Sequence, residues 1–249
     1  MSGTAARTDR YARHLASVAY RASRKRKAEL IAAVCGEPLR TAQAVVDLGA
    51  GTGLVRSALE RIVGRTIVGF EIDRAFIEKP ARMAVADLLC LPVRDGSIDF
   101  GIANHVYEHV ADLERFFAEL KRALAPAGRV YLTAGNRFAL IEPHYRIPTL
   151  SWWPEPVATR VLRWTRRGER YDDIRFTTHR SLVETARRQG LRMEDLTDHV
   201  LGRHLDRYES PLGRSMGRLA TRVPGRLRRS LLRAFSPQWF FLIRHAGVQ

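Results

Sequence analysis

The hydrophobic positions of the chain form short unbroken runs separated by amphipathic stretches. Val45, Val46 and Leu48 make the first run, and apolar neighbours without alternation are typical of a strand buried on both faces of a parallel sheet. Strands are expected at 44–48, 65–72, 83–86, 97–104, 129–134, 191–200 and 238–244. Helices are expected at 8–35, from 54, at 113–124 and at 178–189, with Gly and Pro as their stops. This alternation predicts an α/β fold, a doubly wound, seven-stranded and mostly parallel sheet.

A glycine-rich turn follows the first strand and carries the first candidate chemistry. Glycines at 49, 51 and 53 allow a sharp turn and close approach of the backbone to a ligand. A dinucleotide turn would need glycine at 54, which is Leu54, and the turn holds no Lys or Arg for a phosphate. The Asp47 carboxylate favours a cationic ligand instead. S-adenosylmethionine carries a sulfonium and an ammonium group and no phosphate, so the turn predicts a pocket for such a ligand.

Five blocks in order resemble the class I S-adenosylmethionine-dependent methyltransferases, and among them the type-11 group. These blocks are VVDLGAGTG at 45–53, GFEID at 69–73, ADLLCLP at 86–92, DFGIANHVYEHVAD at 99–112 and LKRALAPAGRVYLTAGN at 120–136. The resemblance implies a Rossmann-like methyltransferase fold, S-adenosylmethionine as cofactor, and methyl transfer as the activity.

The expected cofactor contacts come partly from spacing and partly from this resemblance. Glu71 follows Asp47 by 24 residues, close to the spacing at which an acid binds ribose hydroxyls in these folds. The resemblance places Ile72 on the adenine face, and Asp87 and Leu88 at the adenine edge. The whole expected set is Asp47, Gly49, Ala50, Gly51, Gly53, Glu71, Ile72, Asp87, Leu88 and Asn104. No metal site is expected.

Candidates for acceptor contact and proton removal are histidines and a tyrosine. The segment from Glu142 to Pro154 resembles one that covers the acceptor site in bacterial type-11 enzymes encoded with cell-surface glycan genes. His144 and Tyr145 are therefore the first candidates for catalysis, followed by His109 and His105. The alternatives are a hydrogen-bonded loop histidine at 144 and a helix-capping histidine at 109.

The expected domain organisation is a helical cap at 1–40 and a methyltransferase domain at 41–249. Two insertions interrupt the domain, an acceptor lid at about 136–176 and basic amphipathic helices at 201–237. The basic run at 24–27 fits either a solvated helix face or a cap over the cofactor.

Charge suggests an anionic partner. The net charge is +16, and in 212–235 apolar residues at helical spacing face a stripe of arginines. This pattern fits either peripheral contact with an anionic membrane or a cap helix with a solvated basic face. Two cysteines, no apolar leader and no 18-residue apolar run favour a cytoplasmic location, with membrane association possible through 212–235.

The predicted function is methyl transfer by in-line displacement to a small-molecule or lipid- or glycan-linked acceptor, with O-methylation favoured. RNA methylation is an alternative that the charge suggests, but strand four is followed by Asn104-His105-Val106-Tyr107 and not by a base-flipping N/D-P-P-Y/F motif. Nucleic acid is therefore a weaker candidate partner. A non-catalytic S-adenosylmethionine-binding adaptor at a membrane is the third alternative.

Overall fold

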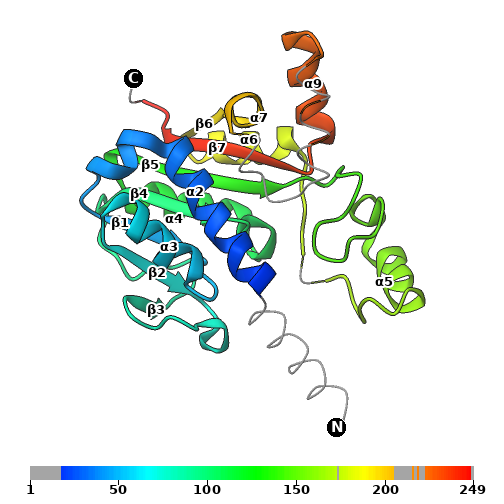
Figure 1. The fold of residues 1–249 in the computed structure, drawn as a ribbon, viewed down its shortest axis with the longest axis horizontal. Coiled ribbons are helices and arrows are strands. Elements are labelled where there is room, and N and C mark those ends of the chain that lie inside the picture. The colour runs from blue at the N-terminus through cyan, green and yellow to red at the C-terminus, as the bar shows by residue number, and fades with distance from the viewer. Residues whose placement is uncertain (1–17, 173, 205–214, 216–217, 219–221, 248–249) are drawn as a thin grey trace.

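The computed structural model describes residues 18–172, 174–204, 215, 218 and 222–247, and a seven-stranded sheet is its centre (Figure 1). The strands are β1 Val45–Leu48, β2 Ile67–Glu71, β3 Met83–Val85, β4 Ile98–Asn104, β5 Leu124–Gly135, β6 Leu191–Asp195 and β7 Gln238–His245. Their order is β3-β2-β1-β4-β5-β7-β6. Strands β1 to β5 run parallel, whereas β7 lies antiparallel between β5 and β6. The predicted doubly wound, seven-stranded and mostly parallel sheet is confirmed.

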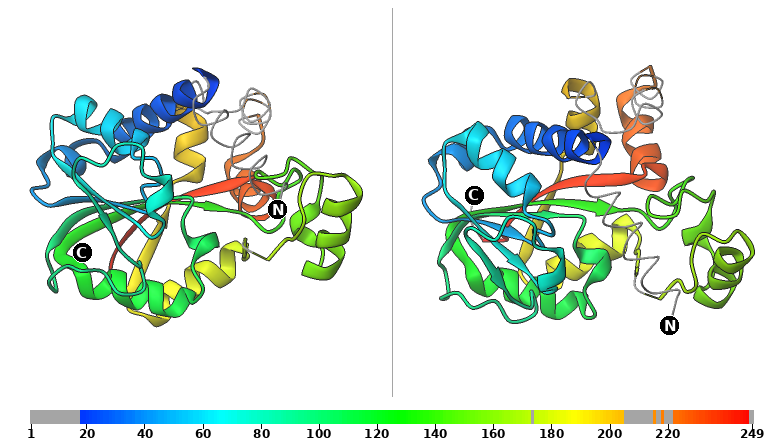
Figure 2. Two further views of the ribbon diagram at one scale, coloured as in Figure 1. Left: turned by 90° about the horizontal axis from the view of Figure 1, so that it is seen from below. Right: turned by 60° about the horizontal axis from the view of Figure 1, so that its bottom comes forward.

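Helices cover both faces of this sheet (Figure 2). They are α2 Val18–Thr41, α3 Leu54–Val63, α4 Leu113–Ala123, α5 Glu155–Trp164, α6 His179–Arg188, α7 Thr197–Arg203 and α9 Gly225–Phe235. Single 3-10 turns lie at Arg74–Phe76, Tyr107–His109 and Leu150–Trp152. Helices α2, α3, α7 and α9 pack on one face and α4 and α6 on the other, while α5 belongs to the insertion after β5.

Alternate residues of the central strands enter two separate cores, which explains the unbroken apolar runs. Phe100 and Ile102 of β4 pack with α2 and α3, whereas Ala103 packs with α4. Tyr131 of β5 likewise faces the first core and Leu132 the second. Because side chains alternate across a strand and both faces are dry, both sets must be apolar.

The N-terminal helix differs from its prediction. Residues 8–17 lie outside the described part, and the helix continues past the expected stop to Thr41. Gly36 interrupts it with φ of 52°, and Pro38 then lies in the first turn of the continuation, where its missing N–H costs little. Leu30, Ile31 and Leu39 are buried in the same core as β1 and β4, so the predicted boundary at residue 40 falls within a packed layer of the sheet domain.

Three other boundaries need correction. Helix α4 ends at Ala123, and Leu124 already pairs with Ile98, so the fifth strand begins before Pro126 and passes an irregularity in register. The predicted sixth strand at 191–200 is a strand only to Asp195, because Thr197 begins α7. Helix α5 was not predicted.

The insertion at 136–176 has a small core of its own, formed by Ile147, Leu150, Ala158, Leu162, Tyr171 and Ile174. It lies beyond the carboxyl end of β5 (Figure 1). The buried amide of Asn136 anchors its start by donating to the carbonyls of Ala234 and Ser236, 2.9 and 2.8 Å away. Within the described part of the chain, every helix is too short or too polar to cross a bilayer.

Candidate functional site

The glycine turn closes tightly behind β1. Gly49 has φ of 71°, and a Cβ at this position would lie 2.6 Å from Cγ2 of Val106. The Ala50 amide donates to the Phe70 carbonyl at 2.9 Å, which joins the turn to β2. Gly53, also at φ of 71°, is the N-cap of α3. The turn therefore needs glycine for its left-handed backbone, and at Gly49 also for the close approach of the β4 loop.

Glu71 at the tip of β2 is held by backbone amides. Its Oε2 accepts from the Gly51 amide at 2.8 Å, and its Oε1 accepts from Ile72 and Asp73 at 2.9 and 3.2 Å. Each carboxylate oxygen has two lone-pair directions, so Oε1 is fully used and one direction of Oε2 remains for a hydroxyl donor. The neighbouring Ile72 side chain is 64% exposed, which leaves an apolar surface beside the acid.

Asp47 is buried under the turn, between β2 and β4. Its pKa is raised from 3.8 to about 7, chiefly because burial penalises the charged form; the Arg56 guanidinium opposes this rise, and the Glu71 charge adds to it. The carboxyl therefore changes its charge near neutral pH. A cation bound nearby would favour the ionised form.

The remaining predicted cofactor residues lie at neighbouring strand ends. Asp87 is exposed, and its Oδ1 accepts from the Leu89 amide at 2.9 Å. Leu88 is buried in the core, so only its backbone is available to a ligand. Asn104 ends β4 and is half-buried. These positions form one carboxyl-terminal edge with the glycine turn, the edge where ligands bind in open α/β sheets.

Three histidines gather just past β4. His105 adopts φ of 57°, and its Nδ1 lies 3.1 Å from Oε1 of Glu108. The exposed His109 ring meets the His144 ring edge-on, with centroids 5.5 Å apart. His144 Nδ1 lies 2.9 Å from Oε1 of Glu142. The structure thus brings together three of the four predicted catalytic residues, although His144 follows His109 by 35 positions.

Two glutamates are hydrogen-bonded to His105 and His144, and neither glutamate is among the predicted site residues. Glu108 and Glu142 are both 0% exposed. Burial alone would raise the pKa of Glu108, but the hydrogen bond with His105 and the charges of His105 and His109 lower it on balance. The sequence did hold a signal for both glutamates, since each lies close before a histidine. Glu108 directly precedes His109, and Glu142 precedes His144 by two positions.

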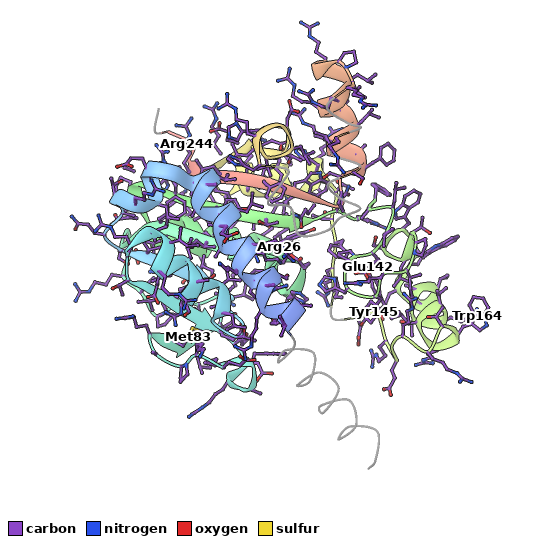
Figure 3. The ribbon with its side chains drawn as sticks, in the orientation of Figure 1. Arg26, Met83, Glu142, Tyr145, Trp164 and Arg244 are labelled. Atoms are coloured by element: carbon purple, nitrogen blue, oxygen red, sulfur yellow. The ribbon has the colours of Figure 1, made fainter. Side chains whose placement is uncertain are left out.

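The fourth candidate, Tyr145, has a mainly structural setting. Its amide donates to Oε2 of Glu142 at 2.5 Å, and its ring packs on Tyr171 with centroids 5.9 Å apart. Glu142 and Tyr145 lie in the segment between the sheet and α5, whereas Trp164 points outward from α5 (Figure 3). The tyrosine ring is thus packed against the insertion's own core.

The end of the insertion is hydrogen-bonded to the loop that follows β4. The Arg175 amide donates to the Glu108 carbonyl at 2.8 Å, and the Tyr107 hydroxyl donates to the Gly135 carbonyl at 2.5 Å. A hollow of about 240 Å³ lies beside Arg175, at this end of the insertion. Its lining includes Arg137, Trp153, Glu155, Tyr171, Arg175 and Phe176. The Phe176 ring also contacts His144, with centroids 5.7 Å apart, so the hollow and the histidines are neighbours.

Comparisons with known proteins agree with this geometry. A family model described as a methyltransferase domain matches residues 46–132. Malonyl-[acyl-carrier protein] O-methyltransferase of Geobacter sulfurreducens is 27% identical, over 72% of this chain and 67% of that protein. Ubiquinone/menaquinone biosynthesis C-methyltransferase of Acidiphilium cryptum is 30% identical, over 48% of this chain and 52% of that protein.

The fold is also found in solved structures. A possible histamine N-methyltransferase from Thermotoga maritima superposes with a TM-score of 0.52 at 17% identity, over 96% of this chain and 95% of that one. Across six curated relatives, the matched part spans between 21% and 67% of their own length. The family model covers the chain from β1 into β5 and ends before the insertion at 136–176.

Proposed function

The chain belongs to the class I S-adenosylmethionine-dependent methyltransferases, and from this premise we propose that it methylates an oxygen of a small-molecule or lipid- or glycan-linked acceptor. The observation that carries the proposal is the position of His144, whose Nδ1 lies 2.9 Å from a fully buried carboxylate, beside the carboxyl-terminal edge of the sheet. Bound there, S-adenosylmethionine supplies a methyl group on a sulfonium, open to in-line displacement.

The cofactor contacts in this proposal follow the strand ends. Glu71 accepts from a ribose hydroxyl with the remaining lone pair of Oε2, and Ile72 packs on the adenine. Asp87 accepts from the adenine amine, and the Leu88 amide donates to the ring. The glycine turn and Asp47 lie under the charged part of the ligand, with Asn104 and His105 beyond it. The Gly49 and Gly53 geometry supports this fit, because side chains there would obstruct the turn.

His144 is the proposed proton acceptor. If Nδ1–H donates to Glu142, Nε2 is left with a lone pair directed to the acceptor, as in carboxylate-oriented catalytic histidines. The methyl forms a bond to the acceptor oxygen as its bond to sulfur breaks, and the hydroxyl proton moves to Nε2. Such general base catalysis contributes about 10²- to 10⁴-fold in rate. A carboxyl acceptor, already ionised, would need no base.

The test uses labelled cofactor and a cell extract fractionated into lipid, glycan, RNA and protein. We expect label in the lipid or glycan fraction or in small molecules. With the purified acceptor, His144→Ala should lower kcat by about 10²-fold or more while cofactor affinity stays unchanged. His199→Ala, which removes a histidine of α7, is the matched control. Label confined to RNA, or an unchanged kcat in His144→Ala, would contradict the proposal.

We further propose that α9 contacts an anionic membrane. Leu227, Leu231 and Phe235 are spaced by four residues and are 55%, 42% and 46% exposed. The exposed arginines Arg226, Arg229 and Arg233 lie on the opposite side of the helix. This arrangement supports interfacial binding, to which Arg226 and Arg229 each contribute about 1 kcal/mol, whereas Arg233 is already paired with Asp195 at 3.5 Å. Leu212, Met216 and Leu219, in the first half of the expected amphipathic region, lie outside the described residues.

Flotation with anionic and neutral vesicles tests this contact. We expect binding to anionic vesicles that weakens with salt and with the triple change Leu227→Ser, Leu231→Ser and Phe235→Ser. A matched variant, Val157→Ser on α5, changes an apolar residue of similar exposure (39%) outside the patch. Equal flotation of the triple variant and the natural chain would exclude α9 as the contact.

A further inference from the structure

Glu108, His109 and His144 form a potential metal-binding set. One ligand atom from each residue lies within 4.8 Å of the others. Two imidazoles and a carboxylate are the donor set of many catalytic zinc sites, which keep a further position open. No sequence pattern indicated this set, because its third member comes from the insertion.

The surroundings of these residues resemble the outer shell of a metal site. Glu142, fully buried, lies 2.9 Å from His144 Nδ1, so that Nε2 is the nitrogen directed away from it. The candidate ligand Glu108 is itself held in place by an outer partner, because Nδ1 of His105 lies 3.1 Å from its Oε1. Metal-binding histidines usually donate their second N–H to a carboxylate, which fixes the ring and raises ligand basicity.

A second and independent observation is the other oxygen of Glu108. Among the described residues, no hydrogen-bond donor reaches Oε2, although the side chain is 0% exposed. A buried carboxylate oxygen without a partner is unfavourable, and each such group calls for an explanation. A cation beside Oε2 would satisfy it.

We propose that Glu108, His109 and His144 bind one divalent first-row transition ion of the zinc class, through Oε2 and two imidazole nitrogens. The role of this ion, which rests on the proposed function, is to bind the acceptor oxygen in the open position and stabilise it as an oxyanion. In the metal-bound protein His144 Nε2 is a ligand and takes no proton. The ion lowers the pKa of the bound hydroxyl, whose proton is released to water, and the oxyanion then forms its bond to the methyl carbon as the carbon–sulfur bond breaks.

The experiment uses the full, untagged chain after treatment with chelator. Calorimetric titration with Zn²⁺ should give one saturable site, and Co²⁺ should give the visible absorption of a low-symmetry nitrogen and oxygen site. His109→Ala and His144→Ala should abolish both signals. Glu142→Gln, which keeps all three ligands, should weaken Zn²⁺ binding by about 10- to 100-fold.

His199→Ala is the matched control, because His199 and His204 form another close pair, with ring centroids 5.5 Å apart. Its Zn²⁺ affinity should equal that of the natural chain. Absence of a saturable site, or a site lost in His199→Ala but kept in His109→Ala, would overturn the metal proposal. S-adenosylmethionine binding to the metal-free protein tests the proposed function separately, and it also verifies that each variant is folded.

Discussion

The buried carboxyl of Asp47 should make the stability of the protein depend on pH near neutrality. Its pKa is about 7 in the folded chain, against 3.8 for an ordinary aspartate, because burial penalises the charged form. A raised carboxyl pKa means that Asp47 stays protonated up to a higher pH in the folded state than in the unfolded chain. Stability from this group is therefore fully present below pH 3.8 and is lost as the pH rises toward 7.

The loss follows from these two values. Between pH 5 and pH 8, Asp47 alone should lower the free energy of unfolding by about 3 kcal/mol. Asp47→Asn keeps the shape of the side chain and removes the titration. The stability of the variant minus that of the natural chain should therefore rise by this amount over the same range.

Urea unfolding followed by circular dichroism at pH 5, 6, 7 and 8 measures this difference, and other titrating groups cancel in it. Glu119→Gln is the matched control, because the hydrogen bond with Arg122 lowers the pKa of Glu119, so that this carboxyl titrates mainly below the pH range of the assay in both the folded and the unfolded state. Its difference from the natural chain should stay nearly constant. Parallel stability curves for Asp47→Asn and the natural chain would refute the electrostatic reasoning.

Three further results are expected. Binding of S-adenosylmethionine at pH 7 should release about half a proton, because Asp47 with a pKa of about 7 is half protonated there and a bound cation favours its ionised form. Calorimetry in two buffers of different ionisation enthalpy measures this release, and its absence would contradict the contact between Asp47 and the cofactor. Gly49→Ala should destabilise the protein more than Gly64→Ala in urea unfolding, because both have positive φ but only Gly49 faces Val106 at 2.6 Å; equal losses would show that the close approach is unimportant. Tyr107→Phe should lower the free energy of unfolding by about 1–3 kcal/mol in the same assay, because the Gly135 carbonyl and the Thr177 amide would each lose the Tyr107 hydroxyl as hydrogen-bond partner. A change below about 0.5 kcal/mol would contradict this.

The sequence by itself determined the sheet and the glycine turn at its carboxyl-terminal edge. The strand at Val45 to Leu48 could be predicted without tertiary information, because a strand buried on both faces is apolar along its length. Asp47, a buried carboxyl next to the glycine turn, is the exception in this strand. The glycine turn was equally readable, because positive φ at Gly49 and Gly53 restricts the choice of residue.

Only the tertiary structure decided where helices continue and what the histidines contact. Gly36 is a break rather than an end because the segment after it buries Leu39 in the core. Residues 197–203 are helical because Val200 and Leu201 pack beneath the sheet. Glu108, His109 and His144 meet because the insertion folds around its own small core and is fastened to the β4 loop, as at Arg175. Local sequence encodes periodicity and backbone restriction, whereas contacts between distant segments depend on burial that only the folded chain provides.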